Sequence, residues 1–377
     1  MLKPGTAAAG PGVTVLPDGR VRSLVPDDLE AVALLFGRIF PARAGRRAGA
    51  ARDDLGEILF RHPWTEAGLP SLAYEDRDGR LAGCLGVMAR PMSLDGRPFL
   101  AAISHTFMVE PGARAGLAAV ALARAFLSGG QDLSIAEGGE ASRRILERLG
   151  GSSSLLYSIR WTRPLRPGRY LLTLLERRGL PRPLAWCLAP LSRAADALAP
   201  RLLRGVARPP APTGPGEAAG DDQLLQGVAE VSRPRALRPI YDRESLAWLL
   251  DFLRGRRERG DLQRVVVRDG RGEILGFYLY YLSRGGVSEV VQVGARPRAL
   301  PGVLDHLAHH AWSRGAVAVS GQLDPATAHA YAAQGSLFHH DGASWFLVHA
   351  RRPEILEAIR RGDAFLTRLE GEWCISL

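Results

Sequence analysis

The feature that most constrains the fold is a pattern of strands and helices that occurs twice along the 377-residue chain. The segment RDGRLAG at 77–83 returns as RDGRGEILG at 268–276, and strand-like and helix-like segments follow both copies in the same alternating order. An internal duplication explains this order most economically. The alternative is a pair of unrelated α/β domains that share a common hairpin turn.

The first copy predicts the element order βααβββαβαβ. A short strand at 21–25 precedes a helix that starts at Pro26-Asp27-Asp28, and a second helix covers about 53–61. Three strand-like runs between 71 and 111 are joined by Asp-Gly turns at 78–79 and 95–96, which is typical of an antiparallel meander. The remaining elements are a helix that follows the loop after Val109, the strand DLSIAE, the helix EASRRILERLG and the strand SLLYSIRW. This order predicts a mixed α/β fold, with a mostly antiparallel sheet flanked by helices.

The second copy repeats the later part of this pattern. Its segments, in order, are the strand VSEVVQVGA, the helix LPGVLDHLAHHAWSRG, the strand VAVSGQL, the helix DPATAHAYAAQG and the strand SWFLVHA. We therefore expect two domains of the same class, at 21–163 and 221–377, after a flexible N-terminus at 1–20.

The connector at 164–220 is strongly basic. Residues 160–209 contain eleven arginines against Glu176 and Asp196, which accounts for nearly all of the net charge of +10. The same stretch carries apolar runs cut by prolines, which predict short helices, and it ends in the linker RPPAPTGPGEAAGDD. Two interpretations remain open: segment 164–207 lies on an anionic membrane surface, or its apolar faces pack onto the two domains while the arginines are solvated.

Composition excludes several classes of protein. Three widely separated cysteines offer neither a disulfide framework nor a metal-ligand spacing, so we expect a reduced, cytoplasmic setting and no metal. No apolar run suits a signal peptide or a spanning helix. Nucleic-acid binding is not expected, because the basic residues cluster in a proline-broken apolar segment without interleaved stacking aromatics.

The loop before the helix at about 115–127 is a candidate anion site. In Arg114-Ala115-Gly116-Leu117-Ala118, small residues let the backbone approach an anion, and the amides and dipole of the helix start favour negative charge. The Arg114 guanidinium would add a charge-assisted contact. The alternative is that Gly116 and the alanines serve tight packing of the helix on the sheet.

The first copy resembles the GNAT acyltransferase superfamily, and the whole chain resembles its tandem, two-domain members. The entry VRSLVPDDLEAVALLF, the meander LDGRPFLAAISHTFMVEP and the loop-helix GARAGLAAVALARAFL carry the resemblance. In that family acyl-CoA lies where the fourth and fifth strands separate, and its pyrophosphate sits on a loop of the form Arg/Gln-x-x-Gly-x-Gly/Ala. The loop that begins at Arg114 is one residue shorter than this form.

The resemblance also implies roles for particular residues. A backbone N–H at Met108 or Val109 would stabilise the oxyanion, and His105 or Glu137 would act as the base. The family's acid is often a tyrosine four residues before the glycine that closes the next helix, but Leu146 stands there. Tyr157 or a water is then the expected acid.

The second copy departs from the family's form in the opposite way, because it lacks the amide donors of the anion loop but has a tyrosine at the acid position. Pro297 and Pro301 stand where amides would be donated, whereas Tyr331 matches the family's acid position. The histidines of DHLAHH and HHD are expected to be solvated or capping residues, because no HExxH glutamate accompanies them.

We therefore expect an N-acyltransferase that uses acetyl-CoA or another acyl-CoA, bound to the first domain, and an amine acceptor. The resemblance to tandem members suggests an amino sugar or an envelope-polysaccharide precursor as that acceptor. A degenerate second domain would help to shape the acceptor site. The alternative is a non-catalytic acyl-CoA-binding or scaffold protein with the same fold.

Overall fold

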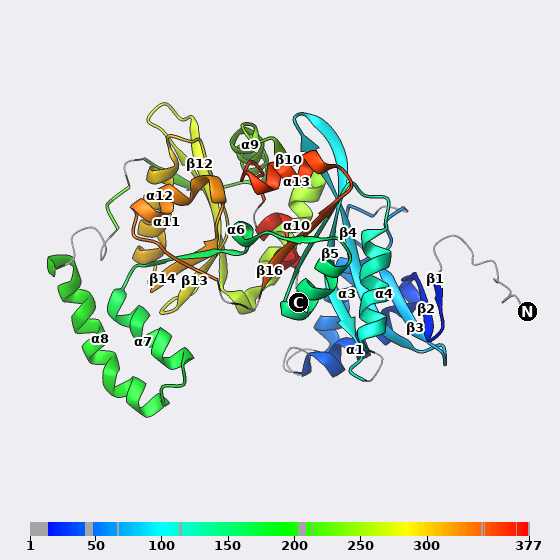
Figure 1. Cartoon of the computed structure of the whole chain (residues 1–377). Coiled ribbons are helices and arrows are strands. Elements are labelled where there is room, and N and C mark those ends of the chain that lie inside the picture. Colours follow the sequence, from blue (N-terminus) through cyan, green and yellow to red (C-terminus); the bar gives the residue numbers. More distant parts are fainter. Residues whose placement is uncertain are drawn as a thin grey trace, which may run out of the picture. The chain divides into compact units, whose positions relative to one another are not determined.

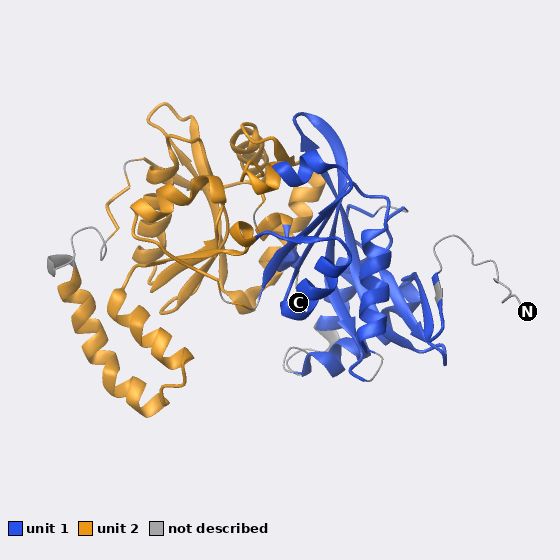
Figure 2. Cartoon of the chain, viewed as in Figure 1, with its two compact units in different colours: residues 1–154, 344–357, 371–377 blue, residues 155–343, 358–370 orange. Residues whose placement is uncertain are grey.

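The computed structural model describes residues 14–41, 48–65, 68–112, 115–202, 209–212, 214–340, 342, 344–366 and 368–375. The chain forms two compact units, coloured separately in Figure 2. The first unit comprises residues 1–154, 344–357 and 371–377, and the second comprises residues 155–343 and 358–370. Each unit is described below by itself.

The first unit is an α/β layer structure built on one mixed sheet. Its strands are β1 (Thr14–Leu16), β2 (Gly19–Ser23), β3 (Leu72–Asp76), β4 (Leu81–Leu94), β5 (Arg97–Val109), β6 (Leu133–Gly138), β7 (Ser152–Ser153) and β16 (Trp345–Ala350). Its helices are η1 (Pro26–Asp28), α1 (Leu29–Ile39), α3 (Ala48–Phe60), α4 (Ala115–Leu127), α5 (Glu140–Arg148) and α14 (Glu372–Ile375), and α13 (Pro353–Arg360) starts in this unit and ends in the second.

The sheet order is β1-β2-β3-β4-β5-β6-β16-β7, and the pair β5–β6 alone among these is parallel. Helix α4 supplies the crossover that a parallel pair requires (Figure 1). It packs Leu122 and Phe126 on Leu85 and Val87 of β4. The opposite face of the sheet is covered by α1 and α3, which contact β4. The predicted fold class is confirmed for this unit.

The second unit repeats this plan. Its strands are β8 (Arg160–Pro164), β9 (Gly216–Ala218), β10 (Leu237–Pro239), β11 (Asp261–Arg268), β12 (Ile274–Leu282), β13 (Val287–Ala295), β14 (Ala318–Gln322) and β15 (Leu337–His339). Its helices are α6 (Leu155–Ser158), α7 (Pro167–Arg177), α8 (Arg182–Leu202), α9 (Asp221–Ser232), α10 (Arg243–Gly255), η2 (Arg257–Arg259), α11 (Leu300–Ser313), η3 (Pro325–Thr327), α12 (Ala328–Ala333) and η4 (Arg368–Glu370).

The sheet of the second unit has the order β15-β8-β14-β13-β12-β11-β9, and again one pair, β13–β14, is parallel. Helix α11 crosses over between these two strands, as α4 does in the first unit (Figure 1). The tandem arrangement predicted from the internal repeat is therefore present in the fold.

The last strand of each predicted domain lies in the other unit. We expected the segment ending in Arg160-Trp161 to close the first sheet, but residues 155–158 form α6, and β8 pairs with β14 of the second unit. The strand SWFLVHA, expected to close the second sheet, is β16 and pairs along the whole of β6. The two compact units therefore differ from the continuous limits 21–163 and 221–377. The alternation of residues along a strand shows which of its faces is buried, but it does not specify which sheet edge the strand joins.

The predicted termini and connector also differ from the structure. Part of the N-terminus expected to be flexible is ordered, because β1 and β2 form a hairpin from Thr14 onward; residues 1–13 lie outside the described part. In the connector, α8 continues through Pro190, where we expected a break. The linker ends earlier than expected, because β9 at 216–218 pairs with β11.

Candidate functional site

The first unit contains a gap in its sheet where β5 and β6 separate. The two strands pair only at 101–103 with 133–135, although β5 continues to Val109 and β6 to Gly138. A β-bulge distorts β5 just beyond the last pair, and Thr106 there has a φ of 50°, which is rare for a β-branched residue. Backbone groups of β5 beyond Ile103 are thus released from pairing with β6.

The ladder between β4 and β5 decides which of the two predicted oxyanion donors faces this gap. Glu110 donates its N–H to the carbonyl of Ala82, and Gly83 stands opposite Val109. In an antiparallel pair the hydrogen-bonding direction alternates, so Met108 bonds to β4 while the N–H of Val109 points away from it. Val109, and not Met108, therefore presents its N–H on the side from which β6 has separated.

The candidate anion cradle lies at the start of α4. Ala115, Gly116 and Leu117 form the first turn, in which a helix supplies no carbonyl acceptors for its amides, and no acidic side chain occupies that turn. A Cβ atom added to Gly116 would meet nothing within 4 Å, so tight packing does not explain this glycine. Ala118, by contrast, is buried in the core. Arg114 lies outside the described residues.

The two predicted bases lie on one face of the sheet, at the two strands that flank the gap. His105 and Glu137 each follow the last paired residues of their strands, Ile103 and Ile135, by two positions. His105 is completely buried, and burial together with the nearby His62 lowers its pKa to about 3. A buried imidazole with so low a pKa is a weak and inaccessible base. Glu137 is partly exposed, so it fits that role better.

The structure does not support Tyr157 as the acid. This tyrosine belongs to α6 in the second unit, where its buried hydroxyl donates a hydrogen bond of 2.9 Å to the carbonyl of Ala364. Burial raises its pKa as well. Leu146, at the family's acid position, packs in the core of the first unit beneath α4.

Sequence reasoning missed a polar cluster on the face that carries His105. His62 and Trp64 follow α3, and the buried guanidinium of Arg90 on β4 lies 4.0 Å from the Trp64 ring centroid. Burial, with the charge of Arg90, lowers the pKa of His62 to about 4. The segment Arg61-His62-Pro63-Trp64, which concentrates polar and aromatic groups at a helix end, was the available signal.

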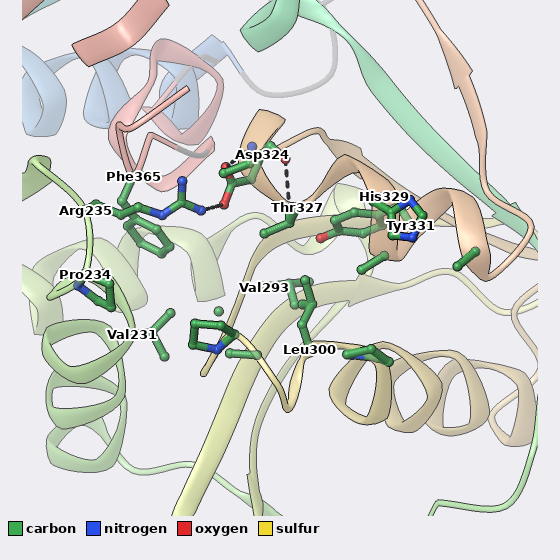
Figure 3. A pocket seen from close by; sticks show the side chains of 17 residues that line it. Val231, Pro234, Arg235, Val293, Leu300, Asp324, Thr327, His329, Tyr331 and Phe365 are labelled. Carbon is green, nitrogen blue, oxygen red and sulfur yellow. Dashed lines mark hydrogen bonds and ion pairs between the residues drawn. The ribbon is translucent and has the colours of Figure 1, made fainter. Parts of the chain in front are cut away.

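The second unit has the same separation of strands and, at that place, a cavity of about 600 Å³ (Figure 3). β13 pairs with β14 only at 287–290, and Arg296 donates to the carbonyl of Leu275, so that Ala295 faces the gap as Val109 does. The cavity is lined mainly by small and apolar residues. Its charged members are Arg235 and Asp324, which form an ion pair of 2.6 Å.

Two features of this cavity match the sequence expectation for the second copy. Pro301 occupies the second position of α11, where α4 has Gly116, so an amide is missing there. Tyr331 lines the cavity and packs against Trp161, with the ring centroids 4.6 Å apart and the ring planes tilted by 37°. Burial raises the pKa of Tyr331, which keeps the phenol protonated and able to donate.

Two of the three histidines of α11, His306 and His310, bond to tyrosines and are not free in solvent, contrary to expectation. His306 is buried and hydrogen-bonds the hydroxyl of Tyr278 at 2.8 Å, and His310 does the same with Tyr280. Burial lowers the pKa of both imidazoles, to about 4 for His310. In the described parts of the chain, His, Cys, Asp and Glu side chains form no group of three that could hold a metal ion. Asp341 lies outside the described residues.

A second, more polar cavity of about 540 Å³ lies beneath α7. Arg160 donates to both carboxylate oxygens of Glu289 at 3.0 Å, and Thr162 hydrogen-bonds Ser320 at 2.9 Å and His339 at 3.0 Å. No spacing in the sequence joins these residues, because β8, β13, β14 and β15 bring them together only in the folded sheet.

Comparisons with known proteins agree with this architecture. No model of a known protein family matches the chain, and no curated protein is significantly similar in sequence. A GCN5-related N-acetyltransferase from Anabaena variabilis has a similar structure, with a TM-score of 0.59 and 11% identity over 89% of this chain and 73% of that one. A probable N-acyltransferase from Enterococcus faecalis gives 0.56 and 10%, over 88% and 72%.

Saccharomyces cerevisiae N-myristoyltransferase with bound myristoyl-CoA is also similar, with a TM-score of 0.52 and 10% identity over 90% of this chain and 82% of that one. The chain therefore has the fold of GNAT acyltransferases. It has the tandem form of that fold, with two GNAT-like units in one chain.

Proposed function

We propose that the protein is an acyl-CoA-dependent N-acyltransferase whose acyl-CoA binds to the first unit. The observation that carries the proposal is the separation of β5 from β6 after Ile103, followed by a bulge, inside a sheet that is otherwise continuously paired. Structural neighbours with this fold are N-acetyltransferases and an N-myristoyltransferase. The separation offers unpaired backbone donors beside a helix start, which together suit a thioester and a pyrophosphate.

The groups at this site have the following roles in the proposal. The amides of Gly116 and Leu117 bind the pyrophosphate, and Arg114 adds its positive charge. The N–H of Val109 stabilises the oxyanion that forms as the amine nitrogen attacks the thioester carbonyl carbon. Glu137 accepts the ammonium proton, the C–S bond breaks, and a water protonates the leaving thiolate. The products are an amide and CoA.

The acyl group and the acceptor are further parts of the proposal. We propose acetyl-CoA as the donor and an amino sugar or an envelope-polysaccharide precursor as the amine, in the cytoplasm. Thermal-shift measurements against acyl-CoAs of graded chain length test the donor, because a ligand that binds the folded state raises its stability. A larger shift with long-chain than with acetyl-CoA would contradict the acetyl assignment.

Two matched variants test the site. Gly116→Val places a bulky side chain at the proposed pyrophosphate position in the first unit. The control is Gly302→Val, which places the same side chain in the first turn of α11 in the second unit. At both positions an added Cβ meets nothing within 4 Å. Gly116→Val should weaken CoA binding strongly with little loss of stability, whereas Gly302→Val should not. Arg114→Ala should weaken binding by roughly 1–3 kcal/mol. Titration calorimetry should give one CoA per chain; two sites, or unchanged affinity in both first-unit variants, would refute the assignment.

A second candidate places the chemistry in the second unit. Its 600 Å³ cavity, the gap-facing amide of Ala295 and the phenol of Tyr331 favour it. Once an acceptor is acylated, Glu137→Gln and Tyr331→Phe distinguish the two units. Loss of kcat in the first variant alone supports our proposal, and loss in the second alone supports the alternative. Binding of acyl-CoA with no turnover of any amine would instead indicate a non-catalytic binding protein.

A further inference from the structure

Helices α7 and α8 form a hairpin that extends from the sheet of the second unit (Figure 1). Small residues make the interface between the two helices: Ala185, Ser192 and Ala199 are the buried positions of α8. The N–H of Gly168 in α7 donates to Asp196 of α8 at 2.7 Å. The large apolar side chains of the hairpin are therefore not used to hold it together.

Those large side chains are instead exposed. On α8 they recur at spacings of four, three and seven residues, which places them on one face of the helix: Leu184, Leu188, Leu191 and Leu198. Leu191 is 66% exposed, and Leu171 on α7 is 58% exposed. Trp186 is 84% exposed. The alternative raised by the sequence, that the apolar faces of the connector pack onto the two units, does not hold for this face of α8, whereas Leu174 of α7 is half-buried beside the sheet of the second unit.

The charges of the hairpin are mostly positive. The exposed arginines of the hairpin are Arg177, Arg178, Arg182 and Arg193, and none of them forms an ion pair with another described residue. Asp196 is already paired with Arg169 at 2.7 Å. Glu176 is the other described acidic residue of the two helices. The surface is thus complementary to an anionic partner that also accepts apolar side chains.

We propose that the α7–α8 hairpin docks the protein on the surface of a membrane that contains anionic lipid. The leucine face of α8 enters the headgroup region, and the positive charge of the exposed arginines attracts the hairpin to the anionic surface. Within the described parts of the chain, none of the helices combines the length and apolar composition needed to cross a bilayer. This proposal does not depend on the acyltransferase activity.

Vesicle sedimentation of the full chain tests the proposal. The protein should bind vesicles of phosphatidylcholine mixed with phosphatidylglycerol, bind phosphatidylcholine alone weakly, and be released by high salt. The double variant Leu188→Ser/Leu191→Ser should lower the affinity by about tenfold or more, because it removes much of the buried apolar area. Arg182→Gln/Arg193→Gln should weaken binding to anionic vesicles selectively.

The matched control is Leu34→Ser, which changes an exposed leucine of α1 in the first unit and should leave vesicle binding unchanged. Circular dichroism checks that the hairpin variants remain folded. Equal binding by the leucine variant, or no binding by the unmodified chain, would overturn the proposal. So would a dimer in light scattering that the leucine variant disperses, because a second copy would then cover the face.

Discussion

Replacing His105 by glutamine should remove part of the acid sensitivity of this protein's stability. Glutamine is a suitable replacement because the second sheet has a glutamine at the equivalent position. Gln292 stands opposite Leu279 there, as His105 stands opposite Gly86 in the first sheet. His105 is buried as a neutral imidazole. Its Nδ1 lies 3.0 Å from the hydroxyl of Thr106, and its Nε2 has no hydrogen-bond partner among the described residues.

The size of the effect follows from the pKa of His105. Burial lowers it to about 3, from 6.5 in the unfolded chain. Between these two values the unfolded state binds more protons, so the stabilising contribution is fully present above pH 6.5 and is lost as the pH falls toward 3. For one such group the free energy of unfolding should fall by about 2 kcal/mol between pH 7 and pH 5.

Urea denaturation at pH 7 and pH 5, followed by tryptophan fluorescence, measures this difference. In His105→Gln the loss between the two pH values should be about 2 kcal/mol smaller than in the unmodified protein, whatever the absolute stability of the variant. Val87→Ala is the control, because it removes buried apolar atoms from the same sheet without touching a titratable group. It should lower stability similarly at both pH values. If His105→Gln loses as much unfolding free energy between pH 7 and pH 5 as the unmodified protein does, the conclusion that His105 is buried in its neutral form is wrong.

Three further predictions concern packing and capping. Gly86→Ala should cost roughly 1–3 kcal/mol of unfolding free energy in urea, because the new Cβ would lie 2.5 Å from Nδ1 of His105. Asp242→Ala should cost about 1 kcal/mol in the same assay, because the Asp242 side chain accepts the N–H of Ser245 at 2.8 Å and caps α10; Asp242→Asn should retain most of that stability. Leu122→Ala should lower the free energy of unfolding by about 2–5 kcal/mol, because Leu122 is completely buried on the side of α4 that packs on the sheet. A loss below 1 kcal/mol there would contradict the core we describe.

Local signals in the sequence predicted the parts of the fold that depend on local chemistry. The turn at Asp95-Gly96 forms where the dipeptide indicated, with both residues at positive φ. The helix after the Pro111-Gly112 loop also begins close to the expected position, at Ala115. The repeat of these elements was sufficient to predict two units of one class, which the fold confirms.

Features that depend on contacts between distant parts of the chain could not be predicted from the sequence. The partner of β16 is decided by the edge that β6 leaves open, and nothing in the apolar pattern of 344–350 distinguishes that edge from the edge of β14. The positive φ of Thr106 contradicts the preference of a β-branched residue, so only the folded sheet imposes it. The burial of His105 likewise depends on helices far away in the sequence, and this is why its role as a base looked plausible from the strand alone.

The placement of β16 has a consequence for how the chain acquires its structure during synthesis. Strands β1 to β7 have left the ribosome once residue 153 has emerged, yet β6 keeps an open edge until residues 345–350 follow. An exposed strand edge pairs readily with other chains, so the nascent protein is vulnerable to aggregation through most of its translation. A chain released before residue 345 should therefore accumulate as insoluble material or remain bound to a chaperone, even though it already contains every residue proposed to bind acyl-CoA.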